Sequence, residues 1–122
     1  MKVLITGSAH GIGRACAEFF LNRGSEVWGM DILPPSIEDE RYHHIIADVR
    51  NPEDFPELSV EVLVNNAGVQ ESGDDIGINL KGVINVTEHY AIGNPDLKSV
   101  VIIGSASAHT GSEFPEYAAS KG

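Results

Sequence analysis

Short apolar runs alternate with stretches of helical periodicity along this 122-residue chain. The apolar runs predict five strands, at residues 3–5, 26–30, 43–47, 61–64 and 99–103. A helical period follows the first run, and a second one covers residues 76–91. Alternation of this kind predicts βαβ units, and therefore a parallel sheet with helices on its faces.

Each helical period predicts one buried stripe. In the first helix the stripe is expected to contain Ile12, Ala15, Cys16, Phe19 and Phe20, with Arg14, Glu18 and Asn22 outside it. Gly24 is expected to end this helix at the C′ position. In the second helix the inward residues are expected to be Ile76, Leu80, Val83, Ile84 and Tyr90.

Polar and glycine residues follow the strands where each strand ends. Asp31, Asp48, the segment 65–68 and the pair Gly104-Ser105 all occupy such positions. In an open parallel sheet, ligands bind at this carboxyl edge. The sequence therefore predicts one nucleotide-binding domain over residues 1–122, with a Rossmann-like doubly wound parallel sheet of about five strands.

A glycine-rich turn, Thr6-Gly7-Ser8-Ala9-His10-Gly11-Ile12-Gly13, joins the first strand to the first helix. Gly7 permits a tight turn, Gly11 lets the main chain approach a pyrophosphate, and Gly13 lets the helix pack close to the sheet. The helix N-terminus would then face the phosphates. An ordinary glycine-rich βα turn is the alternative. The turn residues expected at the cofactor are Gly7, Ser8, His10, Gly11, Ile12 and Gly13.

Asp31 ends the second strand, where a carboxylate can accept both adenosine ribose hydroxyls and would repel a 2′-phosphate. It therefore favours NAD over NADP. His10 is the opposing signal, because a cationic imidazole would tolerate a phosphate. A turn-forming role at the strand end is the alternative for Asp31.

The next two strand ends carry weaker signals. Asp48 would lie beside the adenine, or would only cap a turn. Asn65-Asn66-Ala67-Gly68 combines two amides with small residues where the sheet would meet the cofactor ribose. Asn65 is also expected to brace neighbouring strands.

Tyr117 and Lys121 stand four positions apart, about one helical turn. An ammonium group there can stabilise a phenolate, which makes tyrosine a usable acid or base. The ordinary tyrosine pKa is near 10, and lowering it by about three units takes roughly 4 kcal/mol.

The charge balance excludes several partners. With 8 Lys and Arg against 18 Asp and Glu, the net charge is -10, which argues against nucleic acid and anionic membranes.

No apolar run is long enough to span a bilayer, and the N-terminus shows no signal-peptide pattern. The lone Cys16 fits a reducing cytoplasm. No metal site is expected, because His43 and His44 would point to opposite faces of a strand.

Together these motifs resemble the short-chain dehydrogenase/reductase family. The matching pieces are the glycine-rich turn, Asp48-Val49, Asn65–Gly68, Asn79, the Ser105 region and the Tyr117/Lys121 pair, in the family's order. The resemblance implies an enzyme that interconverts an alcohol and a carbonyl by hydride transfer with a nicotinamide cofactor. It also implies that Asp48, Val49, Asn66, Ala67, Gly68, Tyr117 and Lys121 contact that cofactor.

The resemblance also assigns catalytic roles. Tyr117 would exchange a proton with the substrate oxygen, and Lys121 would lower the pKa of Tyr117 and bind the nicotinamide ribose. Ser105 would hydrogen-bond the substrate oxygen, with Ser107 as the reserve because it stands two positions closer to Tyr117. Asn79 would hold a water for proton relay to Lys121.

The chain departs from the family in two ways. The connections from Asp48 to Asn65 and from Gly68 to Asn79 are short, and the chain stops one residue after Lys121. We therefore expect the N-terminal half of a longer protein, with weak or absent turnover by itself. The longer form would act on a small alcohol or ketone and form homo-oligomers. A catalytically silent dinucleotide-binding module is the second hypothesis, and a nucleotide-sugar epimerase or dehydratase the third.

Overall fold

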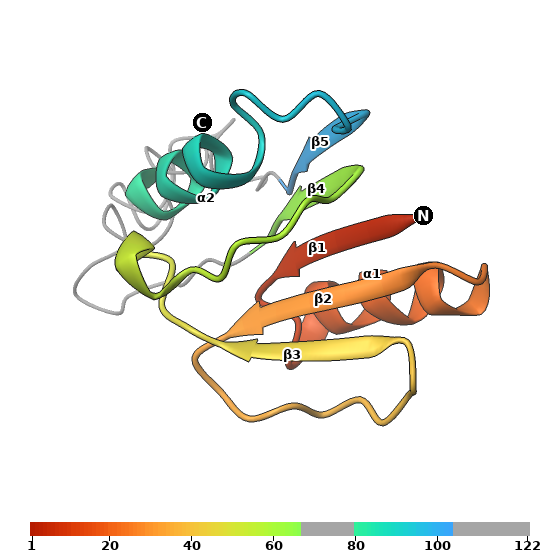
Figure 1. The fold of residues 1–122 in the computed structure, drawn as a ribbon. Coiled ribbons are helices and arrows are strands. Elements are labelled where there is room, and N and C mark those ends of the chain that lie inside the picture. Colours follow the sequence, from red (N-terminus) through yellow and green to blue (C-terminus); the bar gives the residue numbers. More distant parts are fainter. Residues whose placement is uncertain (67–79, 104–122) are drawn as a thin grey trace, which may run out of the picture.

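The computed structural model describes residues 1–66 and 80–103. Within them, one parallel sheet has the strand order β3-β2-β1-β4-β5 (Figure 1). Its strands are β1 (Lys2–Thr6), β2 (Glu26–Asp31), β3 (Tyr42–Ile46), β4 (Val62–Asn65) and β5 (Ser99–Ile102). The helices are α1 (Gly11–Asn22), the short 3-10 helix η1 (Pro52–Asp54) and α2 (Gly82–Tyr90). This confirms the predicted fold class.

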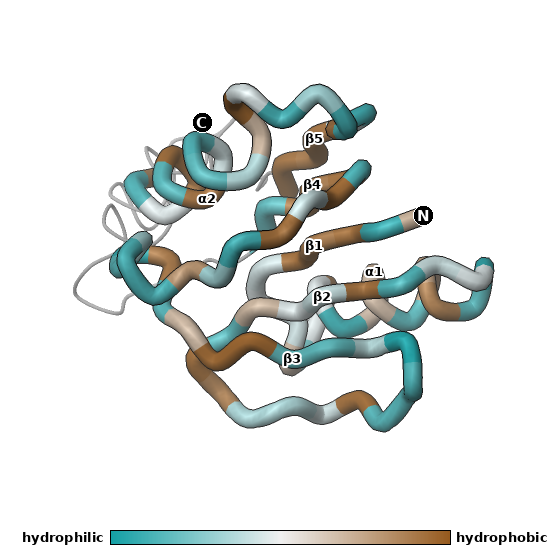
Figure 2. Tube along the Cα trace, viewed as in Figure 1, coloured by the Kyte–Doolittle hydropathy of each residue, from teal (hydrophilic) through white to brown (hydrophobic). Residues whose placement is uncertain are grey.

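Alternate residues of the central strands face opposite sides of the sheet, and a separate apolar cluster covers each side. One cluster packs Val3, Ile5, Val27, Val62 and Val64 against Ala17 and Leu21 of α1. The other packs Leu4, Met30 and Leu63 against Val86 and Tyr90 of α2. Figure 2 shows the hydrophobic colouring that runs along β1, β4 and β5. The two helices therefore lie on opposite faces of the sheet, as Figure 1 shows.

The buried stripe of α1 differs from the predicted one. Gly13, Ala17 and Leu21 are buried, whereas Ile12 is 60% and Phe19 48% exposed. Ala15 is also exposed, and Cys16 and Phe20 are only partly buried. The reason is the close approach of Gly13 to the sheet, because residues at i+4 and i+8 follow it on the same face.

The end of α1 agrees with prediction. Gly24 has a φ of 84°, and its N–H donates to the Leu21 carbonyl at 3.0 Å. The Ser25 N–H donates to the Phe20 carbonyl at 3.0 Å, which completes a Schellman motif.

The inward face of α2 was also only partly predicted. Tyr90 is buried as expected, but Leu80 and Ile84 are 43% and 45% exposed and Val83 is half-buried. The buried residues are Gly82, Val86 and Tyr90, again at i, i+4 and i+8. Ile76 lies outside the described residues.

The connection from β3 to β4 contains η1 as its helical segment. Phe55 follows η1 and stacks on Tyr90, whose hydroxyl donates to the Pro56 carbonyl at 2.8 Å. The short connection predicted from sequence is thus tied to α2 directly. Over residues 1–66 and 80–103, no helix has the length and apolar character needed to cross a membrane.

Candidate dinucleotide site

The strand order reverses direction at β1. From β1 the chain moves outward through β2 to β3, and then returns to β4 on the other side of β1. In sheets of this kind, ligands bind at the carboxyl ends of the two strands that flank this switch point. Gly7 follows β1 and Asn66 follows β4, so both stand at this point.

Asn66 ties these two strand ends together. Its main-chain N–H donates to Thr6 Oγ1 at 3.0 Å, and its side-chain Nδ2 donates to the Gly7 carbonyl at 3.2 Å. Asn65 reaches the other way, because its Nδ2 donates to Thr87 Oγ1 of α2 at 3.2 Å. The Asn65 side chain thus connects the end of β4 to α2, whereas it was expected to brace neighbouring strands; the Asn66 side chain braces the glycine-rich turn.

The glycines of the turn have distinct geometries. Gly7 and Gly11 have φ angles of 70° and 60°, in the left-handed region that favours glycine. Among residues 1–66 and 80–103, no atom lies within 4 Å of a Cβ placed on Gly11, so these residues leave the main chain open to an approaching group there. A Cβ on Gly13 would instead overlap the Gly7 carbonyl and Asn66 Nδ2. Gly13 is therefore what allows α1 to begin so close to the sheet.

The N-terminus of α1 carries the positive end of the helix dipole. His10 is its N-cap residue, with extended backbone and an exposed side chain that makes no capping hydrogen bond. The first turn contains no acidic residue. This end of the helix is therefore arranged to receive an anion such as a pyrophosphate. Ile12, the second residue of α1, is exposed beside it.

Asp31 connects the end of β2 to the glycine-rich turn. Its Oδ2 accepts the Ala9 N–H at 3.0 Å, and its Oδ1 accepts the Leu33 N–H at 3.0 Å. The residue is 9% exposed. A carboxylate offers about four acceptor sites, so both oxygens retain lone pairs for further donors.

Ser8 faces the protein interior. It is fully buried, and its Oγ lies 2.8 Å from the Tyr42 hydroxyl. The Tyr42 hydroxyl lies 2.8 Å from His44 Nδ1, and His44 Nε2 lies 2.8 Å from the Leu33 carbonyl. Burial, with the nearby Asp31 charge, raises the pKa of Tyr42, although its hydrogen bond to Ser8 opposes this. Ser8 is among the turn residues expected at the cofactor, and that contact remains a prediction.

Asp48 and Val49 lie beyond the end of β3. Asp48 pairs with Arg50, with 2.6 Å between Oδ2 and the guanidinium Nη2, and this hydrogen bonding lowers the pKa of Asp48. Val49 is buried, and its carbonyl accepts Asn85 Nδ2 from α2 at 3.0 Å. These contacts hold the Asp48–Val49 segment in place. Its contact with the adenine remains a prediction.

The predicted catalytic residues lie outside the described part of the chain, as do four of the predicted cofactor residues, of which Tyr117 and Lys121 are also catalytic. They are Asn79, Ser105 with its reserve Ser107, Tyr117, Lys121, Ala67 and Gly68. Their roles remain predictions.

Sequence reasoning missed Tyr42 and Asn85. The available signal for Tyr42 was weak, namely a tyrosine that alternates with His44 on one side of a strand.

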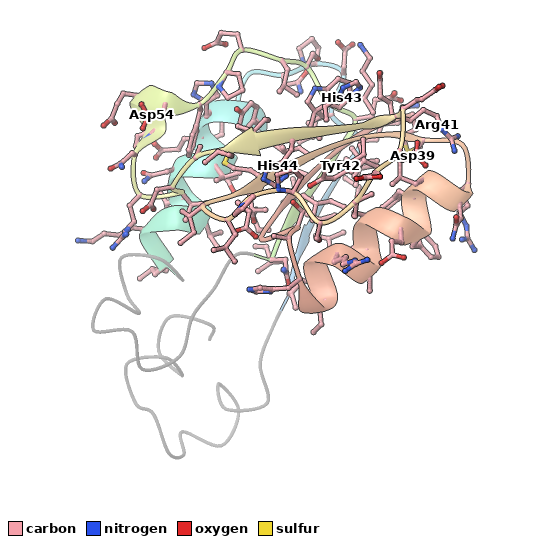
Figure 3. The ribbon with its side chains drawn as sticks, turned by 90° about the horizontal axis from the view of Figure 1, so that it is seen from below. Asp39, Arg41, Tyr42, His43, His44 and Asp54 are labelled. Carbon is pink, nitrogen blue, oxygen red and sulfur yellow. The ribbon has the colours of Figure 1, made fainter. Side chains whose placement is uncertain are left out.

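His43 and His44, which are adjacent in β3, lie on opposite sides of the strand, as predicted. His43 Nε2 lies 2.8 Å from Glu26 Oε2 and its ring packs on Trp28, whereas His44 lies with Tyr42 on the other side of the strand (Figure 3). Within the described ranges, no three His, Cys, Asp or Glu side chains gather as a metal site.

The fold and this edge of the sheet define a nucleotide-binding domain of the Rossmann type. The sequence model of the short chain dehydrogenase family matches residues 1–122. The chain therefore belongs to the short chain dehydrogenase family, a family of oxidoreductases.

Similar proteins agree with this assignment. An uncharacterised oxidoreductase of Schizosaccharomyces pombe is 32% identical over 143 aligned residues, which cover 98% of this chain and 55% of that protein. The ligand-free structure of aldohexose dehydrogenase from Thermoplasma acidophilum superimposes with a TM-score of 0.83 at 34% identity, covering 98% of this chain and 55% of that one.

A structure of 4-hydroxyisoleucine dehydrogenase complexed with NADH has a TM-score of 0.79 at 26% identity, over 98% of this chain and 63% of that one. The chain thus spans about half the length of the curated relatives it matches. The alignment with the S. pombe protein is longer than this chain, so it contains gaps here, consistent with the short connections noted above.

Proposed function

We propose that this chain is the dinucleotide-binding part of an NAD-dependent oxidoreductase that interconverts an alcohol and a carbonyl. The observation that carries the proposal is the glycine-rich turn at the switch point. There Gly13 brings the start of α1 against Gly7 and Asn66, and Gly11 leaves the main chain open. Asp31 stands beside the same turn.

A nicotinamide dinucleotide fits the groups present at this edge of the sheet. The turn from Gly7 to Gly13 and the N-terminus of α1 would hold its pyrophosphate. Asp48 and Val49 would lie at the adenine, and Asn66, Ala67 and Gly68 at the nicotinamide side. When bound, the dinucleotide supplies or accepts the hydride.

Asp31 supports NAD over NADP. Its carboxylate is held in place by two main-chain N–H groups, from Ala9 and Leu33, so it cannot readily turn away from a ligand. A fixed negative charge at the ribose favours two hydroxyls and repels a 2′-phosphate. The exposed His10 is the nearby group that would oppose this preference.

The remaining catalytic roles extend the sequence prediction. Tyr117 would exchange a proton with the substrate oxygen, a step typically worth about 10²–10⁴ in rate. Lys121 would keep the Tyr117 pKa low and bind the nicotinamide ribose. Ser105, or Ser107, would hydrogen-bond the substrate oxygen, and Asn79 would hold a relay water.

The complete protein is proposed to be about twice as long as this chain, in keeping with the share of its relatives that the chain covers. It would act on a small hydroxyl or carbonyl compound as a homo-oligomer. Aldohexoses are the first substrates to assay, because a 34% identical relative is named for them.

The test measures binding and turnover separately. NADH binding is followed by fluorescence with the 122-residue chain and with a form extended through the missing half, and alcohols and ketones are then screened in the extended form. We expect binding in the extended form, turnover only there, and loss of turnover with Tyr117→Phe.

Asp31→Ser is expected to narrow the preference for NADH over NADPH. Binding without turnover, unaffected by Tyr117→Phe, would instead support the silent dinucleotide-binding module. Failure of both forms to bind NADH would refute the proposed function.

A further inference from the structure

A series of hydrogen bonds joins Ser8 of the glycine-rich turn to Tyr42, His44 and the Leu33 carbonyl. The last acceptor determines which atom donates in each bond. The Leu33 carbonyl can only accept, so His44 Nε2 carries the proton and donates to it. In the neutral imidazole, Nδ1 is then an acceptor, and the Tyr42 hydroxyl donates to it. The Tyr42 oxygen is left to accept the Ser8 hydroxyl. The proton of Ser8 is thus committed to Tyr42.

The hydroxyls of Ser8 and Tyr42 are closely packed over Gly29. A Cβ on Gly29 of β2 would overlap both the Tyr42 hydroxyl and Ser8 Oγ. Ser8 is fully buried and Tyr42 is 9% exposed. The absence of a side chain at Gly29 is therefore what allows the two hydroxyls to meet above β2.

The Ser8–Ala9 segment is held by side chains from three successive parts of the chain. Tyr42 of β3 accepts from Ser8, and Asp31 of β2 accepts the Ala9 N–H. Ser36, in the connection between these strands, donates to the Ala9 carbonyl. Figure 3 shows Tyr42 and His44 on the side of β3 that faces α1. The turn is thus fastened to the end of β2, where Asp31 lies.

We propose that Tyr42 is a positioning residue for the adenosine half of the dinucleotide: by accepting from Ser8, it keeps the glycine-rich turn in register with Asp31. The proposal rests on the proposed dinucleotide function. Tyr42 itself need not touch the ligand. Its loss would leave the buried Ser8 hydroxyl without its acceptor, and the turn would shift to find another.

The test compares two tyrosine variants. Tyr42→Phe is expected to weaken binding of both NADH and ADP-ribose about tenfold, because both ligands contain the adenosine half. Tyr90→Phe is the matched control, since it also removes a buried tyrosine hydroxyl, in this case one that donates to the Pro56 carbonyl on the α2 face. Tyr90→Phe is expected to leave both affinities unchanged. In the extended protein, Tyr42→Phe should raise KM for NADH and leave kcat unchanged.

A double variant separates positioning from general destabilisation. Removing both partners of a buried hydrogen bond costs less than removing one. Ser8→Ala combined with Tyr42→Phe should therefore bind ADP-ribose more tightly than Tyr42→Phe alone, and the double-mutant cycle should show coupling. If Tyr42→Phe does not fold, the double variant is compared with the wild type, and ADP-ribose binding equal to that of the wild type would refute the role of Tyr42.

The outcomes are distinct. If the wild type binds NADH but Tyr42→Phe matches Tyr90→Phe in both affinities, the role of Tyr42 is refuted and the proposed function stands. Weakening of NADH but not of ADP-ribose binding would also overturn it, as would additive effects in the cycle. If the extended wild type binds no dinucleotide, the proposed function fails and this proposal fails with it.

Discussion

The helices on the two faces of the sheet bury residues at the same spacing but make different polar contacts. Each helix buries a glycine, then a small or medium residue, then a large one at i, i+4 and i+8: Gly13, Ala17 and Leu21 in α1, and Gly82, Val86 and Tyr90 in α2. In α1 the glycine lets the helix start close to the sheet. The buried tyrosine hydroxyls distinguish the two faces, because on the α1 face the Tyr42 hydroxyl meets the buried Ser8 hydroxyl.

The two buried tyrosines show what this difference means. The Tyr42 hydroxyl links two side chains, those of Ser8 and His44, and thereby connects β3 to the glycine-rich turn. Tyr90 donates to one main-chain carbonyl, that of Pro56, and stacks on Phe55. The α2 face thus uses its tyrosine to fasten a connection, whereas the α1 face uses its tyrosine to hold the turn at which a dinucleotide would bind.

The largest expected effect tests the start of α1. Gly13→Ala places a Cβ against the Gly7 carbonyl and Asn66 Nδ2, so either the helix or the turn must move. We expect the free energy of unfolding to fall by about 3 kcal/mol and NADH binding to be lost, because overpacking against main chain cannot relax easily. Urea unfolding and NADH titration measure the two effects.

Gly93→Ala is the control for this substitution. Gly93 has a φ of 79°, so alanine there is strained, but its Cβ would meet no atom of the described part of the chain within 4 Å. A cost of about 1–2 kcal/mol with unchanged NADH binding is expected. Equal loss of NADH binding in both variants would contradict the special role given to Gly13.

The second prediction tests the α2 face alone. Val86 is fully buried among Leu4, Leu63 and Tyr90, so Val86→Ala leaves a cavity and should cost about 2 kcal/mol. NADH affinity should remain that of the wild type, measured at a temperature where both proteins are folded. A fall in affinity comparable to that of Tyr42→Phe would show that the two faces are not separate in function.

The fold was largely predictable from sequence because strand signals in a parallel sheet are strong. Buried strands read as short continuous apolar runs, and the five predicted runs match the five strands to within a residue at each end. Helix faces were harder. Ile12 and Phe19 look like core residues by hydropathy, but the position of Gly13 against the sheet turns them outward. The hydropathy of a glycine does not show that the missing side chain allows a close contact, such as that of Gly13 with Gly7 and Asn66.

The candidate site was predictable where main-chain geometry dominates. Gly7, Gly11 and Gly13 have the conformations and spaces their spacing implied, and Asp31 lies beside the turn. Tyr42 was missed because its importance depends on pairing with Ser8, which lies far from it in the sequence. Long-range contacts between two ordinary polar residues leave no local pattern to read.

A third and smaller prediction concerns the polar contact from α2 to the site. Asn85 Nδ2 donates to the Val49 carbonyl at 3.0 Å, next to Asp48. Asn85→Ala should lower the free energy of unfolding by about 1 kcal/mol through the lost hydrogen bond. It should weaken ADP-ribose binding about threefold, which is roughly 0.7 kcal/mol, if Val49 lies at the adenine. Glu88→Ala, an exposed change on the same helix, should do neither.

The smallest expected effect is that of Asp48→Asn on acid stability. The pKa of an ordinary aspartate is near 3.9. Hydrogen bonding to Arg50 lowers the pKa of Asp48 from its ordinary value. A group with a depressed folded pKa stabilises the protein above its unfolded pKa, and this contribution is lost as pH falls through the folded value. Because Arg50 is 41% exposed, solvent screening limits the loss to about 0.5–1 kcal/mol at neutral pH. The difference between wild type and variant should shrink below about pH 4, as followed by urea unfolding.

Asp39→Asn serves as the control for this variant, because Asp39 also pairs with an arginine two positions later, Arg41, at 3.8 Å. Asp39 stands before β3, at the opposite end of that strand from Asp48. If Asp48 lies at the adenine, its substitution should also weaken ADP-ribose binding, whereas Asp39→Asn should not. Equal affinities in the two variants would leave the carboxyl end of β3 with a structural role alone, and would confine dinucleotide recognition to the turn that Tyr42 fastens.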